Sequence, residues 1–311
     1  MNIAWPLYGH EAAQASFLAS ATSAKLHHGW LIEGPSGIGK ATLANRLAAY
    51  MLGARGPDNA PLHAATTDPV ARICLAGGHP DLRTVHRELN DKGKLRQDIA
   101  VDQIRDLSQF FSLKPAQGGW RVGIIDSLDE LNRNGANALL KTLEEPPANS
   151  ILFLVNHGTT PILPTIRSRC RVLRLTTLNE DDTKRALDSA GASADALALS
   201  KGRPGLGLRL STPSGLAAAH AAKVLVRSLP RPNDGLLTDA LQSAGADETA
   251  MEAFQEEILA WLASKAEQEP AAATAWLNIS RLAGEARALK MDPAQTASKL
   301  IAGLYSAARS H

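Results

Sequence analysis

The chain has 311 residues, of which 44% are hydrophobic and 21% charged, and 33 Lys and Arg against 31 Asp and Glu give a formal net charge of +2. These values are ordinary for a globular protein of two or three domains, and the charge is too balanced for a protein that holds DNA through a basic surface of its own. The sequence has only two cysteines, Cys74 and Cys170, which is typical of a cytoplasmic protein without disulfides. We expect no membrane span, because no run of about 18 apolar residues occurs. We also expect no signal peptide, because the start MNIAWPLYGHE lacks a basic region followed by an apolar one.

The first part of the chain alternates between helical and strand patterns. In chain order the sequence predicts a helix over 10–24, a strand over 30–33, a helix over 40–52, a loop excursion over 53–80, a strand over 81–86, a helix over 101–111, a strand over 120–126, a helix over 132–143, and strands over 151–156 and 171–175. Strands that alternate with helices predict an α/β fold with a parallel sheet covered on both faces.

The pattern changes at Thr177-Leu178-Asn179-Glu180, a Ser/Thr-x-x-Glu capping box that predicts the start of a helix. From there to the end of the sequence only helices are predicted. Residues 210–215 have the composition of a linker, and residues 216–311 predict a bundle of about four or five helices.

The segment 34–41, GPSGIGKA, follows a predicted strand and opens a predicted helix. It matches the phosphate-binding pattern G-x-x-x-x-G-K, in which glycines let backbone N–H groups approach phosphate and a lysine adds a positive charge. The residues of this candidate nucleotide-binding loop are Gly34, Gly37, Gly39, Lys40, Ala41 and Thr42.

The loop lacks one chemical group. The pattern requires Ser or Thr after Lys40, because that hydroxyl binds the magnesium ion of a nucleotide, but this position is Ala41. Thr42 is one residue further, about 100° around the helix, so its hydroxyl is expected to point away. The sequence therefore predicts a phosphate site whose hydrolytic function is reduced.

Polar residues also follow two other predicted strands. Asp126 and Ser127 lie at the end of one, and Asn156 ends another. Because ligands of parallel sheets bind at the carboxyl ends of the strands, we expect these residues to converge with the phosphate loop. Asn156 could face a phosphate or cap the next turn, and the sequence leaves both open.

Three further segments carry a resemblance to a known family. They are IDSLDEL at 125–131, NGANALLKTLEEPP at 134–147 and LPTIRSRC at 163–170. Together with the phosphate loop, they resemble the AAA+ subunits of the bacterial sliding-clamp loader. The resemblance makes Asp126 and Ser127 Walker B-like and Asn156 sensor 1-like.

The resemblance also implies a domain organisation. It is strong over 9–175 and weaker over 176–210, and beyond 215 it rests on helical character and length. The domains that it implies are a P-loop AAA+ parallel-sheet domain over 1–175, a small helical lid domain over 176–210 and an all-helical collar domain over 211–311.

Within this family the chain is more similar to the delta prime type than to the ATP-hydrolysing motors gamma and tau. A motor has the hydroxyl that Ala41 lacks, a Glu in place of Ser127, and an Arg three residues after a Gly in its sensor 2 segment. In this chain the residue three positions after Gly202 is Gly205 and not an Arg. We therefore do not assign a sensor 2 role to Arg203. Because hydrolysis needs metal, water positioning and charge stabilisation together, we expect little or no ATPase activity of the chain's own.

In this family the Arg of a Ser-Arg-Cys motif projects into the ATP site of the neighbouring subunit. The resemblance thus implies that Arg169, between Ser168 and Cys170, is a trans arginine finger whose guanidinium stabilises the transferring phosphoryl group. Arg167 is a weaker candidate. Without the resemblance, Arg169 would be interpreted as a surface residue paired with an acid. Cys170 is expected to pack as a small buried residue.

The implied function is that of a ring member of the DNA polymerase III clamp loader, the DNA-directed DNA polymerase assembly of replication. Its partners would be gamma/tau and delta subunits, with the sliding clamp and primed DNA reached through the complex. Lys141 and Glu145, one helical turn apart, form an exposed ion pair or contact a subunit or DNA. A motor of the same loader is the alternative, whereas a small-molecule P-loop kinase leaves the TLEEPP and SRC elements unexplained.

No cofactor is expected to be required, although the glycine loop and Lys40 suit static nucleotide binding. Many relatives carry four cysteines in the excursion after the first helix of the P-loop domain. A closed zinc site needs four thiolate or imidazole ligands, and residues 53–80 contain only Cys74 beside His63 and His79. We therefore expect no zinc.

Overall fold

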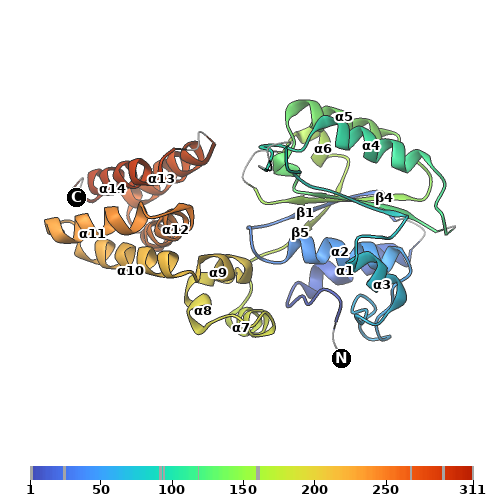
Figure 1. Cartoon of the computed structure of the whole chain (residues 1–311), viewed down its shortest axis with the longest axis horizontal. Coiled ribbons are helices and arrows are strands. Elements are labelled where there is room, and N and C mark those ends of the chain that lie inside the picture. Colours follow the sequence, from blue (N-terminus) through green and yellow to red (C-terminus); the bar gives the residue numbers. More distant parts are fainter. Residues whose placement is uncertain are drawn as a thin grey trace. The chain divides into compact units, whose positions relative to one another are not determined.

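A computed structural model describes residues 3–23, 26–90, 93, 95–117, 119–158, 162–266, 268–288 and 291–309. The chain divides into two compact units, Met1–Ala190 and Gly191–His311. In the described residues the first unit is α/β and the second is helical (Figure 1). The division into three domains stays a prediction.

The first unit is built on a five-stranded parallel sheet with the strand order β2-β3-β4-β1-β5. The strands are β1 (Gly29–Glu33), β2 (Leu82–Val85), β3 (Arg121–Asp126), β4 (Ser150–Asn156) and β5 (Arg171–Arg174). Every residue of the central strand β4 is buried, which explains why it reads as a continuous apolar run. The predicted parallel α/β sheet is confirmed.

The first unit also contains seven helices and one short 3-10 turn among its described residues. They are α1 (Glu11–Ala21), α2 (Lys40–Met51), α3 (Pro69–Leu75), α4 (Val101–Ser112), η1 (Leu128–Glu130), α5 (Arg133–Glu144), α6 (Pro164–Arg167) and α7 (Glu180–Ser189).

Helices cover both faces of the sheet, and successive strand residues pack into opposite cores (Figure 1). On one face, Trp30 packs against Phe17 of α1, with the ring centroids 5.0 Å apart, and against Leu43 of α2. On the other face, Leu31 packs with Leu139 of α5. The alternation follows from the pleat of a strand, which turns neighbouring side chains to opposite sides.

Three sequence predictions about helix bounds are wrong. The expected loop excursion over 53–80 contains α3, which begins where Asp68 accepts a hydrogen bond from the N–H of Ala71 and Pro69 occupies the first helical position. Helix α7 begins at Asn179, whose side chain caps Asp182, and not at the Thr177 capping box. The first helix ends at Ala21, and the predicted end at residue 24 lies outside the described residues.

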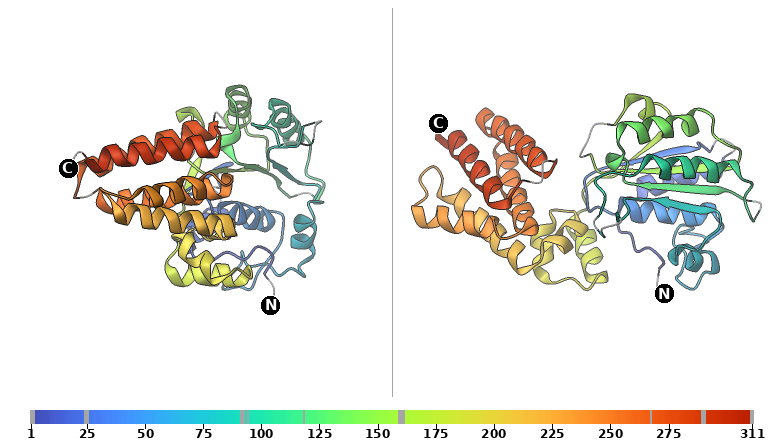
Figure 2. Two further views of the ribbon diagram at one scale, coloured as in Figure 1. Left: turned by 60° about the vertical axis from the view of Figure 1, so that its left-hand side comes forward. Right: turned by 45° about the horizontal axis from the view of Figure 1, so that its top comes forward.

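The second unit is helical in its described residues. Its helices are α8 (Ala194–Ser200), α9 (Pro204–Leu210), α10 (Pro213–Ser228), α11 (Asp234–Ala244), α12 (Glu248–Lys265), α13 (Pro270–Ala288) and α14 (Pro293–Arg309). Helices α10 to α14 agree with the predicted bundle and are seen from two further directions in Figure 2. Fully buried Ala218 and Ala222 let α10 approach its neighbours around Phe254 of α12. None of the described helices is both long and apolar enough to cross a membrane.

Candidate functional site

The carboxyl ends of three adjacent strands meet at one edge of the sheet. In the parallel register Glu33 of β1 lies beside Asn156 of β4, and Asp126 of β3 lies beside Val155. The phosphate loop begins directly after Glu33. The loop, Asp126 and Asn156 therefore converge as the sequence predicted, in the place where parallel sheets bind ligands.

The loop has a backbone conformation that requires glycine. Gly34, Gly37 and Gly39 have φ angles of 149°, 83° and 97°, which residues with a side chain rarely adopt. A Cβ atom on Gly34 would lie 2.3 Å from the carbonyl oxygen of Leu175. Gly39 is the N-cap of α2, so the loop leads into a helix N-terminus, where free N–H groups and the helix dipole favour an anion.

Lys40 turns back onto its own loop. Its Nζ donates hydrogen bonds to the carbonyl oxygens of Gly34 at 2.6 Å and Pro35 at 2.5 Å, and the residue is 2% exposed. Burial lowers the pKa of Lys40 to about 8, and the carboxylates of Asp129 and Asp126 oppose part of this shift. A phosphate that binds the Lys40 ammonium has to compete with these carbonyl contacts.

The N-terminal segment covers the loop from outside. The Nε2 atom of His10 lies 2.9 Å from the carbonyl oxygen of Ile38, and a Cβ on Gly39 would lie 2.6 Å from the Leu7 side chain. Burial lowers the pKa of His10, which favours the neutral ring that donates to Ile38. In the first turn of α2, the carbonyl of Ala41 accepts a hydrogen bond from Asn45 at 2.8 Å, and the direction of the Thr42 hydroxyl stays a prediction.

Acidic residues and one histidine line the edge beside the loop. The side chain of Asp126 is 35% exposed, and its Oδ1 lies 3.7 Å from Nε2 of His157. Asp129 accepts a hydrogen bond from the backbone N–H of His157 at 2.5 Å. Ser127 is 2% exposed, and its hydroxyl has no hydrogen-bond partner among the described residues. Ser127 thus stands at the position after Asp126 where a motor subunit has a Glu, and it supplies no carboxylate there.

The side chain of Asn156 caps the turn that follows β4. Its Oδ1 accepts a hydrogen bond from the N–H of Gly158 at 3.3 Å, and the residue is 7% exposed. This geometry supports the capping alternative. Sequence reasoning missed His157, although its position directly after Asn156, at the end of a buried strand, was the available signal.

A second group of charged residues surrounds Arg169, which follows the short helix α6. Nη2 of Arg169 lies 2.9 Å from Oε1 of Glu144, the last residue of α5, and Nη1 donates to the carbonyl oxygen of Thr165 at 2.9 Å. The side chains of Arg169 and Glu144 are 35% and 48% exposed. Arg169 thus pairs with an acid, as the alternative interpretation of the sequence expected. Its role as a finger stays a prediction.

The neighbours of Arg169 make different contacts. Arg167 pairs with Glu33 at the end of β1, within this chain's own site. The hydroxyl of Ser168 donates to the carbonyl oxygen of Thr165 at 3.1 Å. Cys170 packs against the core, and burial raises the pKa of its thiol to about 12, so the thiol is protonated and unreactive at neutral pH.

A groove with a volume of about 630 Å³ lies between α4 and α5. Lys141 and Glu145 both line it, and Arg105 of α4 adds a second positive side chain. The contact of Lys141 and Glu145 with a subunit or with DNA stays a prediction.

The cysteine of the excursion lies in an apolar setting. Cys74 packs with Ala49 and Ala71, and burial raises the pKa of its thiol to about 11. His79 uses Nδ1 to accept the N–H of Asp81 at 3.1 Å. In the part of the chain that the structure describes, no three His, Cys, Asp or Glu side chains form a group that could hold a metal ion.

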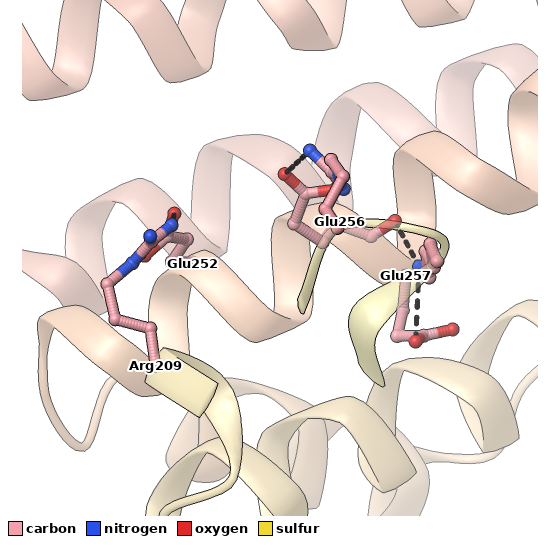
Figure 3. A network of polar contacts seen from close by, with 6 residues as sticks. Arg209, Glu252, Glu256 and Glu257 are labelled. Carbon is pink, nitrogen blue, oxygen red and sulfur yellow. Dashed lines mark hydrogen bonds and ion pairs between the residues drawn. The ribbon is translucent and has the colours of Figure 1, made fainter. Parts of the chain in front are cut away.

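In the second unit, three basic residues of the α8–α9 segment pair with acids of α12 (Figure 3). The pairs are Lys201 with Glu257, Arg203 with Glu256 and Arg209 with Glu252, at 3.1, 2.5 and 2.7 Å. Arg203 also donates through Nη1 to the second carboxylate oxygen of Glu256 at 3.3 Å. This fork-to-fork pairing engages the Arg203 guanidinium within its own unit. It is therefore a physical reason not to assign a sensor 2 role to Arg203.

The parallel sheet and the phosphate loop define a P-loop α/β protein. The structure is similar to that of a DNA polymerase III gamma subunit-related protein from Thermotoga maritima, with a TM-score of 0.51 at 15% identity over 96% of this chain and 99% of that chain. At this identity the comparison shows a shared fold. The family model described as DNA polymerase III, delta subunit, matches residues 9–179, more than half of the chain. The chain belongs to this family and is a clamp-loader subunit of the delta prime type.

Relatives of two types match part of this chain. The DNA polymerase III subunit delta' of Pseudomonas aeruginosa is 39% identical over 143 residues, which cover 46% of this chain and 41% of that protein. The DNA polymerase III subunit gamma of Buchnera aphidicola subsp. Schizaphis graminum is 32% identical over 181 residues, which cover 56% of this chain and 46% of that protein. The chain thus spans about half the length of the curated relatives that it matches.

Proposed function

We propose that the chain is a ring member of the clamp loader whose own phosphate site no longer hydrolyses ATP. The observation that carries this proposal is the side chain of Ala41. A magnesium ion takes oxygen ligands, and a methyl group offers none. Ser127 stands where a carboxylate would orient water, and His157 lies 3.7 Å from Asp126. This donor set does not fit a catalytic magnesium ion, so no metal-dependent step is assigned to the chain.

The same site remains suited to phosphate. The glycine conformations of the loop and the N-terminus of α2 are in place, and the Lys40 ammonium lies in the loop, where a phosphate would compete with the carbonyl oxygen of Gly34 for it. None of these groups depends on a metal ion. We therefore propose that nucleotide binds here statically, without hydrolysis, and that the chain requires no cofactor or zinc of its own.

Arg169 is the residue through which the chain would act on catalysis. A guanidinium stays ionised at every physiological pH and presents a planar fork to phosphate oxygens. Arg169 pairs with Glu144 outside the chain's own phosphate site, whereas Arg167, which is slightly more exposed, pairs with Glu33 within that site. Both features support the assignment of the trans arginine finger to Arg169, which would stabilise the phosphoryl group in a neighbouring gamma or tau subunit.

The helices after the sheet suit a lid over 176–210 and a collar over 211–311. Trp276 and Leu277 on α13 are 37% and 63% exposed, so apolar surface is available for a partner to cover. We propose that the collar joins gamma/tau and delta subunits in a cytoplasmic DNA polymerase III assembly. Through that assembly the chain would serve the sliding clamp and primed DNA.

Two measurements test this function together. Affinity purification of the native full-length chain, followed by mass spectrometry, is expected to recover gamma/tau and delta subunits at comparable amounts. The isolated chain is expected to show no ATP turnover above a no-enzyme control in magnesium buffer. Recovery without any clamp-loader subunit contradicts the ring assignment.

A motor of the gamma/tau type is the alternative function. The observation in its favour is the 32% identity with the Buchnera gamma subunit. Magnesium-dependent hydrolysis by the isolated chain, at the rate of a motor subunit, would establish this alternative and remove our proposal.

A further inference from the structure

The contact between Glu144 and Arg169 joins two segments that the sequence singled out separately. Glu144 ends α5 in the segment 134–147, and Arg169 lies in the segment 163–170. Nη2 of Arg169 lies 2.9 Å from the Glu144 carboxylate, and Nη1 donates to the Thr165 carbonyl at 2.9 Å. The guanidinium therefore has two anchors on different elements, one on a side chain and one on the backbone.

These anchors leave most of the guanidinium available. An arginine has five N–H donors in a rigid planar fork. Nη1 donates one of them to the Thr165 carbonyl and Nη2 pairs with Glu144, and among the described residues the guanidinium makes no further contact, so its other N–H groups are left for phosphate oxygens of a neighbouring subunit. Both anchors fix the plane and the direction of the fork. An arginine that is already oriented loses less side-chain freedom when it meets its target.

We propose that Glu144 is a positioning residue for the arginine finger, a role that rests on the proposed function of Arg169. Glu144 holds the guanidinium in the orientation in which it enters the neighbour's ATP site. It acts through Arg169 alone and touches neither nucleotide nor metal.

The pair suits positioning better than stability. The two side chains are 35% and 48% exposed, and ion pairs between such exposed groups stabilise a fold very little. Glu144 also lies at the far end of the 12-residue helix α5 from η1, which carries Asp129, and a helix of this length spans about 17 Å. Loss of the Glu144 carboxylate is therefore expected to leave the chain's own phosphate loop undisturbed.

The test uses the full chain reconstituted with its loader partners, with steady-state ATP turnover as the readout. Glu144→Ala is expected to lower kcat roughly threefold to tenfold with KM for ATP unchanged, because the finger is disordered and ATP binding is not affected. Glu144→Gln keeps the length and one acceptor oxygen, so its kcat is expected to lie between those of Glu144→Ala and the wild type.

A double-mutant cycle separates positioning from other roles. In an Arg169→Ala background, Glu144→Ala is expected to cause no further loss. Asp188→Ala, which removes an exposed carboxylate from α7, is the matched control and is expected to turn over ATP like the wild type. Urea unfolding midpoints of all variants are compared, and if Glu144→Ala does not fold, Glu144→Gln carries the test.

The outcomes distinguish this inference from the function beneath it. If Arg169→Ala lowers turnover while Glu144→Ala matches or exceeds the wild type, the positioning role is wrong and the finger stands. An additional loss from Glu144→Ala in the Arg169→Ala background also overturns it, because Glu144 would then act by another route. If Arg169→Ala itself leaves turnover unchanged, the finger and its positioning residue are both wrong.

Discussion

Lys40 and Arg169 lie in the same compact unit but in contrasting surroundings. Lys40 is 2% exposed and donates its hydrogen bonds to carbonyl oxygens of its own loop. Arg169 is 35% exposed, donates one hydrogen bond to the Thr165 carbonyl and pairs with Glu144. The lysine that would serve the chain's own nucleotide is turned inward, while the arginine that would serve a neighbour is held at the surface. The contrast fits our proposal that this chain acts on a partner's site and not on its own.

The largest expected effect is on ATP turnover, and it distinguishes Arg169 from Arg167, the two arginines on either side of Ser168. Arg169→Ala is expected to lower ATP turnover of the reconstituted complex at least tenfold, because arginine fingers contribute on the order of 10³ or more at the site that they serve. Arg167→Ala removes a partner of Glu33 in the chain's own site and is expected to change turnover far less. Steady-state assays of the two complexes check this, and equal losses would contradict the assignment to Arg169.

The next effect tests the proposal that Ala41 leaves the chain's own pocket without hydrolysis. Ala41→Ser restores a hydroxyl beside Lys40, so ADP is expected to bind about tenfold more tightly in magnesium than in EDTA. The wild type is expected to bind ADP equally in both buffers. Hydrolysis stays absent in the variant, because Ser127 still supplies no carboxylate to orient water. Calorimetry with both buffers measures the difference, and magnesium-dependent binding by the wild type would show that the pocket still holds the metal.

A smaller effect concerns the buried charge of Lys40. Its pKa is 10.5 in an unfolded chain and about 8 in the folded one, so between these pH values the unfolded chain binds more protons. The free energy of unfolding therefore rises with pH across this window, by about 3 kcal/mol from this residue. Urea unfolding between pH 7.5 and 10.5 is expected to show this rise in the wild type and a smaller one in Lys40→Met. Identical pH profiles would show that Lys40 is not buried as the structure has it.

The smallest effect concerns the second unit. Arg203→Ala removes the fork-to-fork pair with Glu256, in which the side chains are 18% and 24% exposed. The free energy of unfolding is expected to fall by about 1 kcal/mol, while ADP affinity stays unchanged. Urea unfolding and calorimetry on the same preparation measure both quantities. A loss of ADP affinity without a loss of stability would give Arg203 the nucleotide-contacting role that the structure argues against.

The elements that the sequence predicted well are those with a strong local pattern. Strands such as β4, buried on every residue, read as apolar runs, and the glycines of the phosphate loop marked the turn into α2. Convergence of the loop with Asp126 and Asn156 followed from strand topology alone. Helix α3 was missed because its seven residues show little periodicity, although the Asp68-Pro69 start was visible.

Contacts between segments that are distant in the sequence could not be predicted from local sequence patterns. The pair of Glu144 and Arg169 joins the end of α5 to the turn after α6, and nothing near either residue specifies the partner. The inward turn of Lys40 depends on burial of its ammonium under the folded loop. His157 reaches Asp126 only because β3 and β4 are neighbours in the sheet. These features need the tertiary structure.

The most direct test of the contrast compares two complexes that each lack one cation. The loader is reconstituted once with Lys40→Met, which disables the chain's own pocket, and once with Arg169→Ala, which removes the proposed finger. We expect the Lys40→Met complex to hydrolyse ATP at the wild-type rate and the Arg169→Ala complex to be strongly impaired. Full turnover with Arg169→Ala together with impaired turnover with Lys40→Met would show that the chain works through its own site, which contradicts the account.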